Sequence, residues 1–519
     1  MPASLSAKFA KLGFDRPVAL VVWTIIIGTI IRFALAWAAV DLGNSEAYYI
    51  ATGRHFALSY FDHPPLSFWM TWATMQLTGS DWLPILRAPF IATFILTTWL
   101  MYRLTAELFG ETAGAFAALL LNLSPLFTIS IGAWVQPDGP LIAFVLAATL
   151  CVARLAFAPP KAHRVLLWAG AGACCGFALL AKYYAVLLPA GVVLFALTSR
   201  EHRRWFVEPG PYLACAIALA MFAPVLIWNW QHDWISLGFQ GERIIEREGV
   251  QLRWFFDNIL GTAALVGPWI WVPQIQAGIL ALTHGPSETK AWFLAVLAAV
   301  PIVMFTVVAL WVSVGGRFHW QAPGYLLLFP LLGQLLVQKL ERADVTARRW
   351  LLACAAIMVL FVAVIGSHAA TGWIRLLLPA SLESRIGDPT WKGLAWDQVR
   401  ATVAEHGWLG KSRLFVVVPS RSDVGKVDLA LGGFLPVVCL CDDPRNVAFA
   451  EDPHDFIGQD ALIIGAEGYL GDVQALFGQY FRRIDFLDNV DIKRAGRVVL
   501  RIKIFYATDY YKAYPLSVR

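Results

Sequence analysis

Residues 18–40 read VALVVWTIIIGTIIRFALAWAAV, and the polar stretch Asp41-Leu-Gly-Asn-Ser-Glu46-Ala-Tyr-Tyr-Ile50 follows them at once. An apolar run of about 18 or more residues is the signature of a helix that spans a membrane. Such runs recur along the first 370 positions of the chain. The whole chain of 519 residues is 58% hydrophobic and 15% charged, whereas soluble domains carry about 25% charged residues. The composition therefore excludes an ordinary soluble protein and predicts a polytopic α-helical membrane protein.

The apolar runs predict about eleven transmembrane helices, with a range of ten to thirteen. They are expected at 18–40, 84–106, 112–132, 140–158, 165–181, 183–199, 212–229, 259–282, 291–313, 322–340 and 350–369. A short segment at 66–79 is predicted to be a further interfacial or spanning helix. The first run is too long for a signal peptide and lacks a small-residue cleavage site, so we expect it to stay as an anchor.

The C-terminal part of the chain has a different character. From Trp373 onward the long apolar runs stop and charged residues become common. The segments 413–418, 436–440 and 461–464 are typical of buried strands, and the alternating segment 497–505 is typical of a half-exposed strand. We therefore predict a transmembrane domain at 1–372 and a soluble α/β domain at 373–519. The soluble part has no Gly-rich phosphate loop, so no nucleotide-sugar site is expected there.

The distribution of Lys and Arg predicts a cytoplasmic N-terminus, because inner loops of membrane proteins carry an excess of these residues. With that orientation the acid-rich loops 41–83 and 230–258 lie on the outer side. Asp138, Lys182 and the segment Arg317-Phe-His319 stand at span ends on that same side. The sparse polar residues of this apolar protein are therefore expected to gather on one face, together with the soluble domain.

Two acids stand just beyond predicted spans and are candidates for proton transfer. Glu46 follows the first span, and Asp138 lies in the turn Gln136-Pro-Asp138-Gly-Pro140, whose prolines stop a helix. Ionisable groups near membrane depth are costly and usually serve a function. A lone loop acid at a membrane surface is more often merely solvated. The functional interpretation therefore depends on both acids lying on one side.

Basic side chains complete the predicted site. In Phe61-Asp62-His63-Pro64-Pro65 the prolines set the backbone, and the histidine is suited to a phosphate, a metal or a proton, or simply caps a turn. Lys182 is either an anchor that reaches the membrane interface or a point charge for an anionic headgroup. Arg243 and Arg317 are donors suited to phosphate or carboxylate. Together these residues favour an anionic lipid-linked substrate.

The remaining unusual residues carry less information. Cys439 and Cys441 share one face of an apparent strand, and we expect two buried thiols because a zinc site would need further ligands. The net charge of +5 is spread over many loops, so no nucleic-acid partner is expected.

Six motifs follow one another over about the first 330 residues. They are Ser45-Glu46-Ala-Tyr-Tyr, Tyr60-Phe-Asp-His-Pro-Pro65-Leu, Gln136-Pro-Asp138-Gly-Pro-Leu, Ala181-Lys182-Tyr183, Pro224-Val-Leu-Ile-Trp-Asn229-Trp-Gln-His-Asp233-Trp and His319-Trp-Gln-Ala-Pro323-Gly-Tyr. This set resembles the motifs of bacterial GT-C glycosyltransferases. In pattern it is similar to the aminoarabinose transferase of lipid A, the protein O-mannosyltransferase-like enzymes and the galacturonosyltransferases of rhizobial lipopolysaccharide.

The resemblance implies a multi-pass enzyme of the bacterial inner membrane that acts on the periplasmic face. Its donor would be a polyprenyl-phosphate sugar and its acceptor a glycolipid such as lipid A or core saccharide. Glu46 and Asp138 fall on the two acidic catalytic positions. Relatives commonly have Asp-Glu where this chain has Ser45-Glu46, so either Glu46 acts alone or Asp41 contributes.

We assign the other predicted site residues by substrate part. The donor phosphate and its lipid are expected to meet Asp62, His63, Lys182, Tyr183, Arg243, Arg317 and His319. The substrate is expected to contact Tyr48, Tyr49, Tyr60, His232 and Asp233.

The predicted reaction is an inverting glycosyl transfer that needs no certain cofactor. A divalent metal ion stays open, since acids near a phosphate recruit one. One alternative is a protein O-glycosyltransferase of the same fold. Another is a secondary transporter that uses Asp138 and Lys182 as a coupling pair, but transporters place such groups near the midplane of repeated halves. No repeat is visible in this sequence, which favours the transferase.

Overall fold

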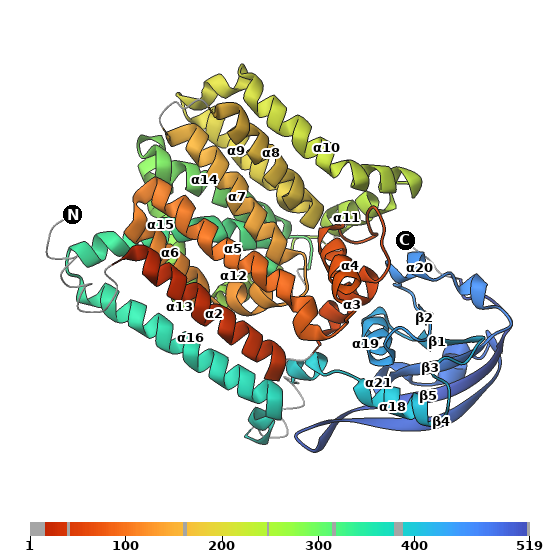
Figure 1. Cartoon of the computed structure of the whole chain (residues 1–519). Coiled ribbons are helices and arrows are strands. Elements are labelled where there is room, and N and C mark those ends of the chain that lie inside the picture. The colour runs from red at the N-terminus through yellow and green to blue at the C-terminus, as the bar shows by residue number, and fades with distance from the viewer. Residues whose placement is uncertain are drawn as a thin grey trace. The chain divides into compact units, whose positions relative to one another are not determined.

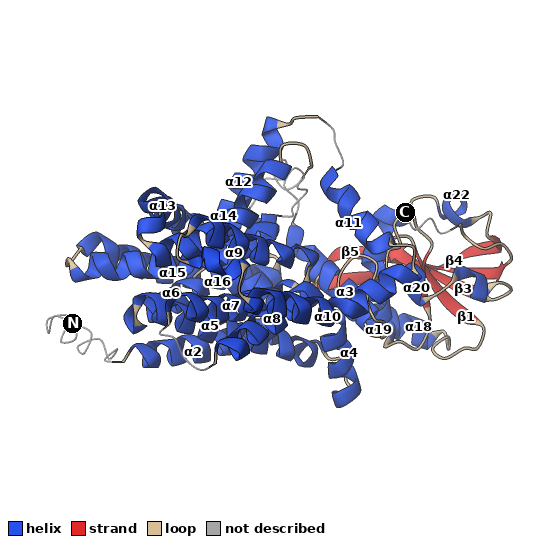
Figure 2. Cartoon of the chain, turned by 90° about the horizontal axis from the view of Figure 1, so that it is seen from above, coloured by secondary structure: helices blue, strands red, loops and turns tan. Residues whose placement is uncertain are grey.

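A computed structural model describes residues 16–38, 42–158, 163–245, 249–313, 318–377 and 388–515. These residues form many helices and one five-stranded sheet, and Figure 2 shows the strands gathered together. The chain divides into two compact units. The first comprises 1–32, 63–66 and 90–361, and the second comprises 33–62, 67–89 and 362–519.

Among the described residues, eight helices are long and apolar enough to cross a membrane. They are α2 (Pro17–Ala38), α5 (Leu83–Phe109), α7 (Asp138–Phe157), α8 (Arg164–Ala181), α10 (Pro209–Gln231), α14 (Thr289–Val308), α15 (Ala322–Glu341) and α16 (Val345–Thr371). Each coincides with a predicted span. Figure 1 labels these helices, whose length and composition make the chain a multi-pass membrane protein.

The other three predicted spans are shorter or broken, which explains the difference from the expected eleven. Segment 112–132 forms α6 (Glu111–Asn122) and, after Pro125, a π-helix at Leu126–Ile131. Segment 183–199 forms a short 3-10 turn and α9 (Leu187–Thr198). Segment 259–282 lies in α12 (Leu252–Val266) and α13 (Pro268–His284), which meet at a 111° bend. Gly267 adopts a positive φ of 94° at that bend, so the helix cannot continue through it.

Close helix contacts in the first unit depend on small residues. A Cβ at Gly172 of α8 would lie 2.4 Å from the carbonyl oxygen of Ala214 in α10. A Cβ at Gly333 of α15 would lie 2.6 Å from the carbonyl oxygen of Ala113 in α6. Small residues at such crossings allow helix backbones to pack closely in a membrane. In this way α8, which also contacts α7, is fixed next to α10.

The sheet of the second unit is mixed and has the order β2-β1-β3-β5-β4. Strands β1 (Leu414–Val418), β2 (Val437–Cys439) and β3 (Asp460–Ala466) are parallel, and β5 (Arg497–Tyr510) pairs antiparallel with β3 and with β4 (Phe481–Arg494). The four predicted strands are present, and β4 was not predicted. Burial of β1 on both faces explains its continuous apolar sequence.

Helices that pack against the sheet or lie between its strands complete the second unit. Helix α3 (Asn44–Gly53) packs against α19 (Arg421–Leu431), and α4 (Leu66–Thr78) follows it (Figure 1). Helix α18 (Asp397–Glu405) precedes β1, α20 (Val447–Ala450) lies between β2 and β3, and α21 (Glu467–Leu470) and α22 (Val473–Phe477) lie between β3 and β4. The loop that was predicted to belong with residues 1–372 therefore shares a core with the sheet, because Tyr48 packs in the same cluster as β1 and β3.

The expectation of two free thiols in β2 was wrong, because Cys439 and Cys441 form a disulfide. Strand β2 ends at Cys439, and the two Cα atoms lie 5.4 Å apart, a separation that a disulfide spans. The alternation of side chains in a strand placed both sulfurs on one side, but it did not indicate that they bond.

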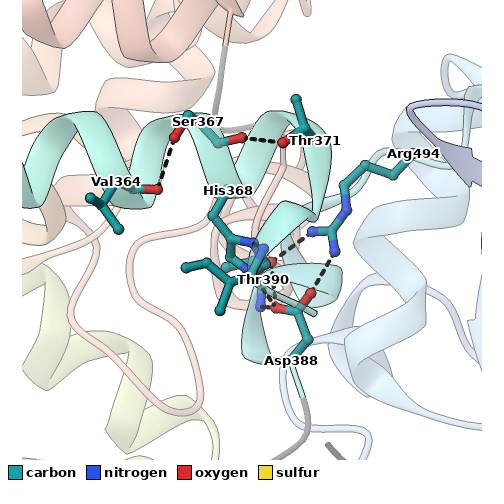
Figure 3. Close-up of polar contacts among 8 residues, drawn as sticks. Val364, Ser367, His368, Thr371, Asp388, Thr390 and Arg494 are labelled. Atoms are coloured by element: carbon teal, nitrogen blue, oxygen red, sulfur yellow. Dashed lines mark hydrogen bonds and ion pairs between the residues drawn. The ribbon is translucent and has the colours of Figure 1, made fainter. Parts of the chain in front are cut away.

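A buried polar cluster joins the end of α16 to the sheet within the second unit (Figure 3). Arg494 of β4 donates to Asp388 at 2.5 Å and to Thr390 at 2.7 Å, and His368 lies 3.3 Å from Asp388. Burial opposes ionisation of Asp388, but hydrogen bonds from Thr390 and Arg494 outweigh it and lower the pKa of this carboxyl. The cluster therefore links the C-terminal end of α16 to the end of β4 through charged hydrogen bonds.

Candidate functional site

The first candidate site is a buried ion pair between the start of α7 and the end of α8. The Lys182 ammonium donates to both carboxylate oxygens of Asp138, at 2.9 and 2.8 Å. The hydroxyl of Tyr184 donates to one of those oxygens at 3.1 Å. Both charged side chains are less than 5% exposed. Helix α7 begins after Pro137, and Asp138 lies in its first turn. The backbone N–H groups at a helix N-terminus favour a carboxylate there.

Two further predicted residues lie near this ion pair. His319, in the 3-10 turn Phe318–Gln321, is close enough for its charge to act on Asp138. Arg243, in α11 (Ile235–Ile245), acts in the same way on Lys182. The guanidinium of Arg243 lies 5.2 Å from the centre of the Trp320 ring. Four parts of the sequence thus contribute to one cluster that is rich in positive charge and aromatic surface.

The neighbouring corner between α10 and α11 holds three more predicted residues. The hydroxyl of Tyr183 forms a 2.6 Å hydrogen bond with that of Ser236. The ring of His232 stacks on Trp228 with 4.1 Å between centroids, and its Nδ1 lies 2.8 Å from the Trp228 carbonyl oxygen. Asp233 has a positive φ of 52° in the turn. These contacts shape the corner and connect it to the segment that carries Lys182.

The second candidate site, in the second unit, contains Glu46. Arg87 at the start of α5 donates to both of its carboxylate oxygens, at 2.8 and 2.6 Å. Both side chains are at most 2% exposed. This forked geometry is the strongest arrangement of an arginine and a carboxylate. For Glu46 to accept a proton, Arg87 would have to release an oxygen. Asp41, the other predicted acid, lies outside the described residues.

Asp62 lies in a separate polar cluster of the second unit. Its carboxylate accepts a 2.7 Å hydrogen bond from the side-chain amide of Asn446 and lies 3.3 Å from Arg445. The same amide donates to the hydroxyl of Tyr48 at 2.9 Å. Burial, together with the negative charge of Asp62, raises the pKa of Tyr48. His63 is partly buried, and Arg317 lies outside the described residues.

The predicted tyrosines of the second unit serve in packing. The hydroxyl of Tyr60 donates to the carbonyl of His55 at 2.8 Å, and burial raises the pKa of Tyr60 to about 12. The ring of Tyr49 lies 5.7 Å from that of Phe68. Among the residues that the structure describes, no group of three or more His, Cys, Asp or Glu side chains is arranged to hold a metal ion.

Sequence reasoning missed Arg87, Tyr184, Arg445 and Asn446. Arg87 had a detectable signal, because an arginine at the edge of an apolar span needs a partner. Tyr184 stands two residues after Lys182, yet nothing in the sequence separates its role from that of Tyr183. Asn446 is 384 residues from Asp62 and belongs to a short connection after β2, so no local pattern identifies it.

Known proteins share sequence features with this chain. A family model described as dolichyl-phosphate-mannose-protein mannosyltransferase matches residues 62–228. An undecaprenyl phosphate-aminoarabinose arabinosyl transferase of Proteus mirabilis is 27% identical over 41% of this chain and 40% of its own length. The lipid A galacturonosyltransferase RgtD of Rhizobium johnstonii is 25% identical over 53% of this chain and 57% of its own. The chain thus spans about half the length of these relatives.

Solved structures match over nearly the whole chain. ArnT from Cupriavidus metallidurans in the apo state has a TM-score of 0.63 at 14% identity, covering 94% of this chain and 98% of ArnT. The chain has the fold of ArnT. The ArnT structure bound to undecaprenyl phosphate scores 0.62 at 16% identity, covering 93% and 97% of the two chains. The resemblance inferred from the motifs and the GT-C fold class are therefore confirmed.

Proposed function

We propose that this chain is a membrane glycosyltransferase that moves a sugar from a polyprenyl-phosphate donor to a lipid A or lipopolysaccharide acceptor. The observation that carries the proposal is the cluster of Asp138, Lys182, Arg243 and His319 within an ArnT fold. The names of the relatives support the donor and acceptor classes, since they include lipid A and undecaprenyl phosphate transferases. We place the N-terminus in the cytoplasm and the reaction on the periplasmic face of a bacterial inner membrane, as the loop charges predict.

The basic cluster suits the departing phosphate. In an inverting transfer the acceptor oxygen bonds to the anomeric carbon, while the bond from that carbon to the phosphate oxygen breaks and leaves its electrons on the phosphate. Lys182, Arg243 and His319 would offset the charge that builds there. A positive cluster is most effective where water is excluded, and Lys182 is 4% exposed.

Asp138 is the side chain best placed to take the proton of the acceptor hydroxyl. Its two oxygens are held by Lys182 in the described structure. An arriving phosphate competes for the same ammonium, which then releases the carboxylate to act as a base. A positioned base of this kind contributes a factor of about 10²–10⁴ to the rate. Glu46 and Asp41 stay predicted contributors, and Glu46 depends on a similar release by Arg87.

A reconstituted reaction tests the proposal. The full chain in lipid nanodiscs would be supplied with undecaprenyl phosphate-aminoarabinose or polyprenyl phosphate-galacturonic acid, with lipid A as the acceptor. We expect transfer to lipid A, and we expect Asp138→Asn to lower kcat about 10²–10⁴-fold without unfolding the protein. Asp257→Asn is the matched control, because Asp257 is an exposed acid on α12. Parent-level turnover by Asp138→Asn would contradict the role of this residue.

A protein acceptor is the second candidate, and the family model of protein mannosyltransferases favours it. A Ser- and Thr-rich peptide in place of lipid A distinguishes the two acceptors in the same assay. Sugar on the peptide and none on lipid A would overturn the glycolipid assignment. Mass spectrometry of envelope glycolipids from cells with and without this chain reports sugar and acceptor together. An unchanged glycolipid profile would count against the whole proposal.

A further inference from the structure

We propose that the C-terminal α/β domain positions residues 42–62 through Lys426, Arg445 and Asn446, and that Asp62 is the anchor of this clamp and not a ligand of the donor phosphate. The proposal rests on the proposed function, because residues 42–62 carry Glu46, one of the acids predicted for the transfer. All of the residues involved belong to the second unit. The clamp consists of the contacts that these three side chains make with segment 42–62.

Asn446 makes the central contacts of the clamp. Its side-chain amide donates to Asp62 at 2.7 Å and to the Tyr48 hydroxyl at 2.9 Å, and its side-chain oxygen accepts from the backbone N–H of Phe61 at 2.5 Å. An asparagine side chain offers two N–H donors and one oxygen. Each is directed to segment 42–62, at two places that are thirteen residues apart in the sequence. Asn446 is 4% exposed, so water cannot replace these bonds.

Arg445 supplies the charge that the anchor needs. Its guanidinium lies 3.3 Å from Asp62 and 3.1 Å from Asp443. Asp62 is 1% exposed, and a buried carboxylate requires both hydrogen bonds and a compensating charge. The backbone of Arg445 has a positive φ of 49°, a conformation that non-glycine residues rarely adopt. That turn presents Arg445 and Asn446 to the same carboxylate.

Lys426 holds the other end of the segment. Its ammonium donates to the backbone carbonyls of Leu42, of Lys392 at 3.0 Å and of Leu394 at 2.5 Å. An ammonium has three donors, and three carbonyls can use all of them. Lys426 is 2% exposed. The Lys426 ammonium therefore links the start of the segment, at the Leu42 carbonyl, to Lys392 and Leu394 of the C-terminal domain.

Gly425 brings α19 against the backbone between these two ends. A Cβ at this position would lie 2.1 Å from the carbonyl carbon and oxygen of Ala47. The two helices therefore meet at backbone distance, one residue from Glu46. The segment is held at its start, its middle and its end, so its geometry depends on the C-terminal domain.

The two roles of Asp62 predict different outcomes for one exchange of residues. As an anchor, Asp62 needs an amide opposite it, and the pair can be reversed. Asp62→Asn would leave two amides facing each other, and Asn446→Asp would place two carboxylates together. The double variant Asp62→Asn with Asn446→Asp restores one donor and one acceptor. The new carboxylate still accepts from the backbone N–H of Phe61, and the Tyr48 hydroxyl, which accepts from Asn446 in the parent, can rotate to donate to it. A ligand of the donor phosphate or of a metal would not be rescued in this way.

Hydrogen exchange of the full chain in nanodiscs tests the clamp independently of turnover. We expect Asn446→Ala, Asn446→Asp and Lys426→Met to speed exchange at 44–62 by about tenfold or more, as local opening becomes easier. The double exchange variant should return most of the lost protection. Asn489→Ala and Lys493→Met are matched controls, because both residues are exposed in β4 of the same domain. Unchanged protection of 44–62 in both Asn446→Ala and Lys426→Met would overturn the proposal.

Binding and turnover separate this proposal from the proposed function. With undecaprenyl phosphate as the probe, Asp62→Asn should bind within about threefold of the parent, while kcat in the transfer assay falls about 10–100-fold through misplacement of the segment. If Asp62→Asn binds undecaprenyl phosphate tenfold more weakly, and the added Asn446→Asp substitution does not restore binding, then Asp62 is a ligand of the phosphate. That result would overturn the clamp proposal. If the parent chain shows no transfer, the proposed function fails, but the exchange data still decide whether the clamp exists.

Discussion

Two buried acid–base pairs, one in each unit, use the same charges in different ways. Glu46 is held by the fork of Arg87, which fills both oxygens in one plane. Asp138 is held by Lys182, whose ammonium is a point charge on a flexible stem, and Arg243 and His319 act on that pair. An arginine fork fixes geometry, whereas a lysine can turn toward a new anion. We therefore expect the Glu46–Arg87 pair to be a fixed structural contact, and the Asp138–Lys182 pair to exchange its contact when an anion binds.

Removal of the arginine should have the largest effect on stability. Arg87→Ala removes the guanidinium that holds both oxygens of the buried Glu46 carboxylate, which costs about 3–5 kcal/mol of unfolding free energy. The neutral variant Glu46→Gln with Arg87→Met should recover most of that loss. Thermal or denaturant unfolding in nanodiscs measures both. If Arg87→Ala has the same unfolding free energy as the parent, the Glu46–Arg87 pair does not stabilise the fold.

Neutralisation of the lysine pair should instead change ligand binding. Asp138→Asn with Lys182→Met removes both charges together, so neither partner is left as an unpaired buried ion and stability should change little. The affinity for undecaprenyl phosphate should fall about tenfold or more, equivalent to about 1.4 kcal/mol. The neutral Glu46 and Arg87 variant provides the control and should bind as the parent does. Equal affinities for the two neutral variants would remove the distinction between the pairs.

Asp423 extends the comparison to a buried acid near Lys426. Among the residues that the structure describes, its buried Oδ2 oxygen has no hydrogen-bond partner, while the nearby Lys426 donates to three carbonyls. Burial raises the pKa of Asp423 to about 7, and the charge of Lys426 opposes the rise. The folded state therefore keeps a proton that the unfolded state loses above about pH 4, so this group lowers stability as the pH rises from about 4 to 7.

Replacement of that acid should have the smallest effect of the three. Asp423→Asn should unfold at a higher temperature than the parent at pH 8 and gain on the order of 1 kcal/mol. At pH 4 the difference should be much smaller, because the carboxyl is protonated in the folded state and still about half protonated in the unfolded state. Thermal unfolding at the two pH values measures the difference. A gain at pH 4 as large as that at pH 8 would show that the charge of Asp423 is not its cause.

The membrane helices were largely predictable because their signal is local. Eight of the eleven apolar runs became long helices, since a bilayer requires about twenty consecutive apolar residues. The run at 112–132 was misjudged because hydropathy does not register the break at Ser124-Pro125. The bend at Gly267-Pro268 likewise depends on two residues within an apolar run. Breaks of this kind change the helix count but not the assignment to a membrane.

The two candidate sites differed in how far the sequence anticipated them. Asp138, Lys182, Arg243 and His319 stand at element ends on one predicted side, so topology alone grouped them. The partners of Glu46 and Asp62 could not be found in this way. Asn446 and Arg445 belong to a connection after β2, and their contact with Asp62 depends on the packing of α19 against α3. A local pattern contains no information about a partner 384 residues away.

That separation has a consequence for the order in which the protein is made. The carbonyl of Leu42 emerges 384 residues before Lys426, the side chain that bonds it. At a synthesis rate of about 5–20 residues per second, segment 42–62 waits roughly 20–80 s for its partners. During that interval its acids and tyrosines lack the domain that will hold them. A chain truncated before α19 would never form these contacts. Segment 42–62 would then stay accessible to quality-control proteases.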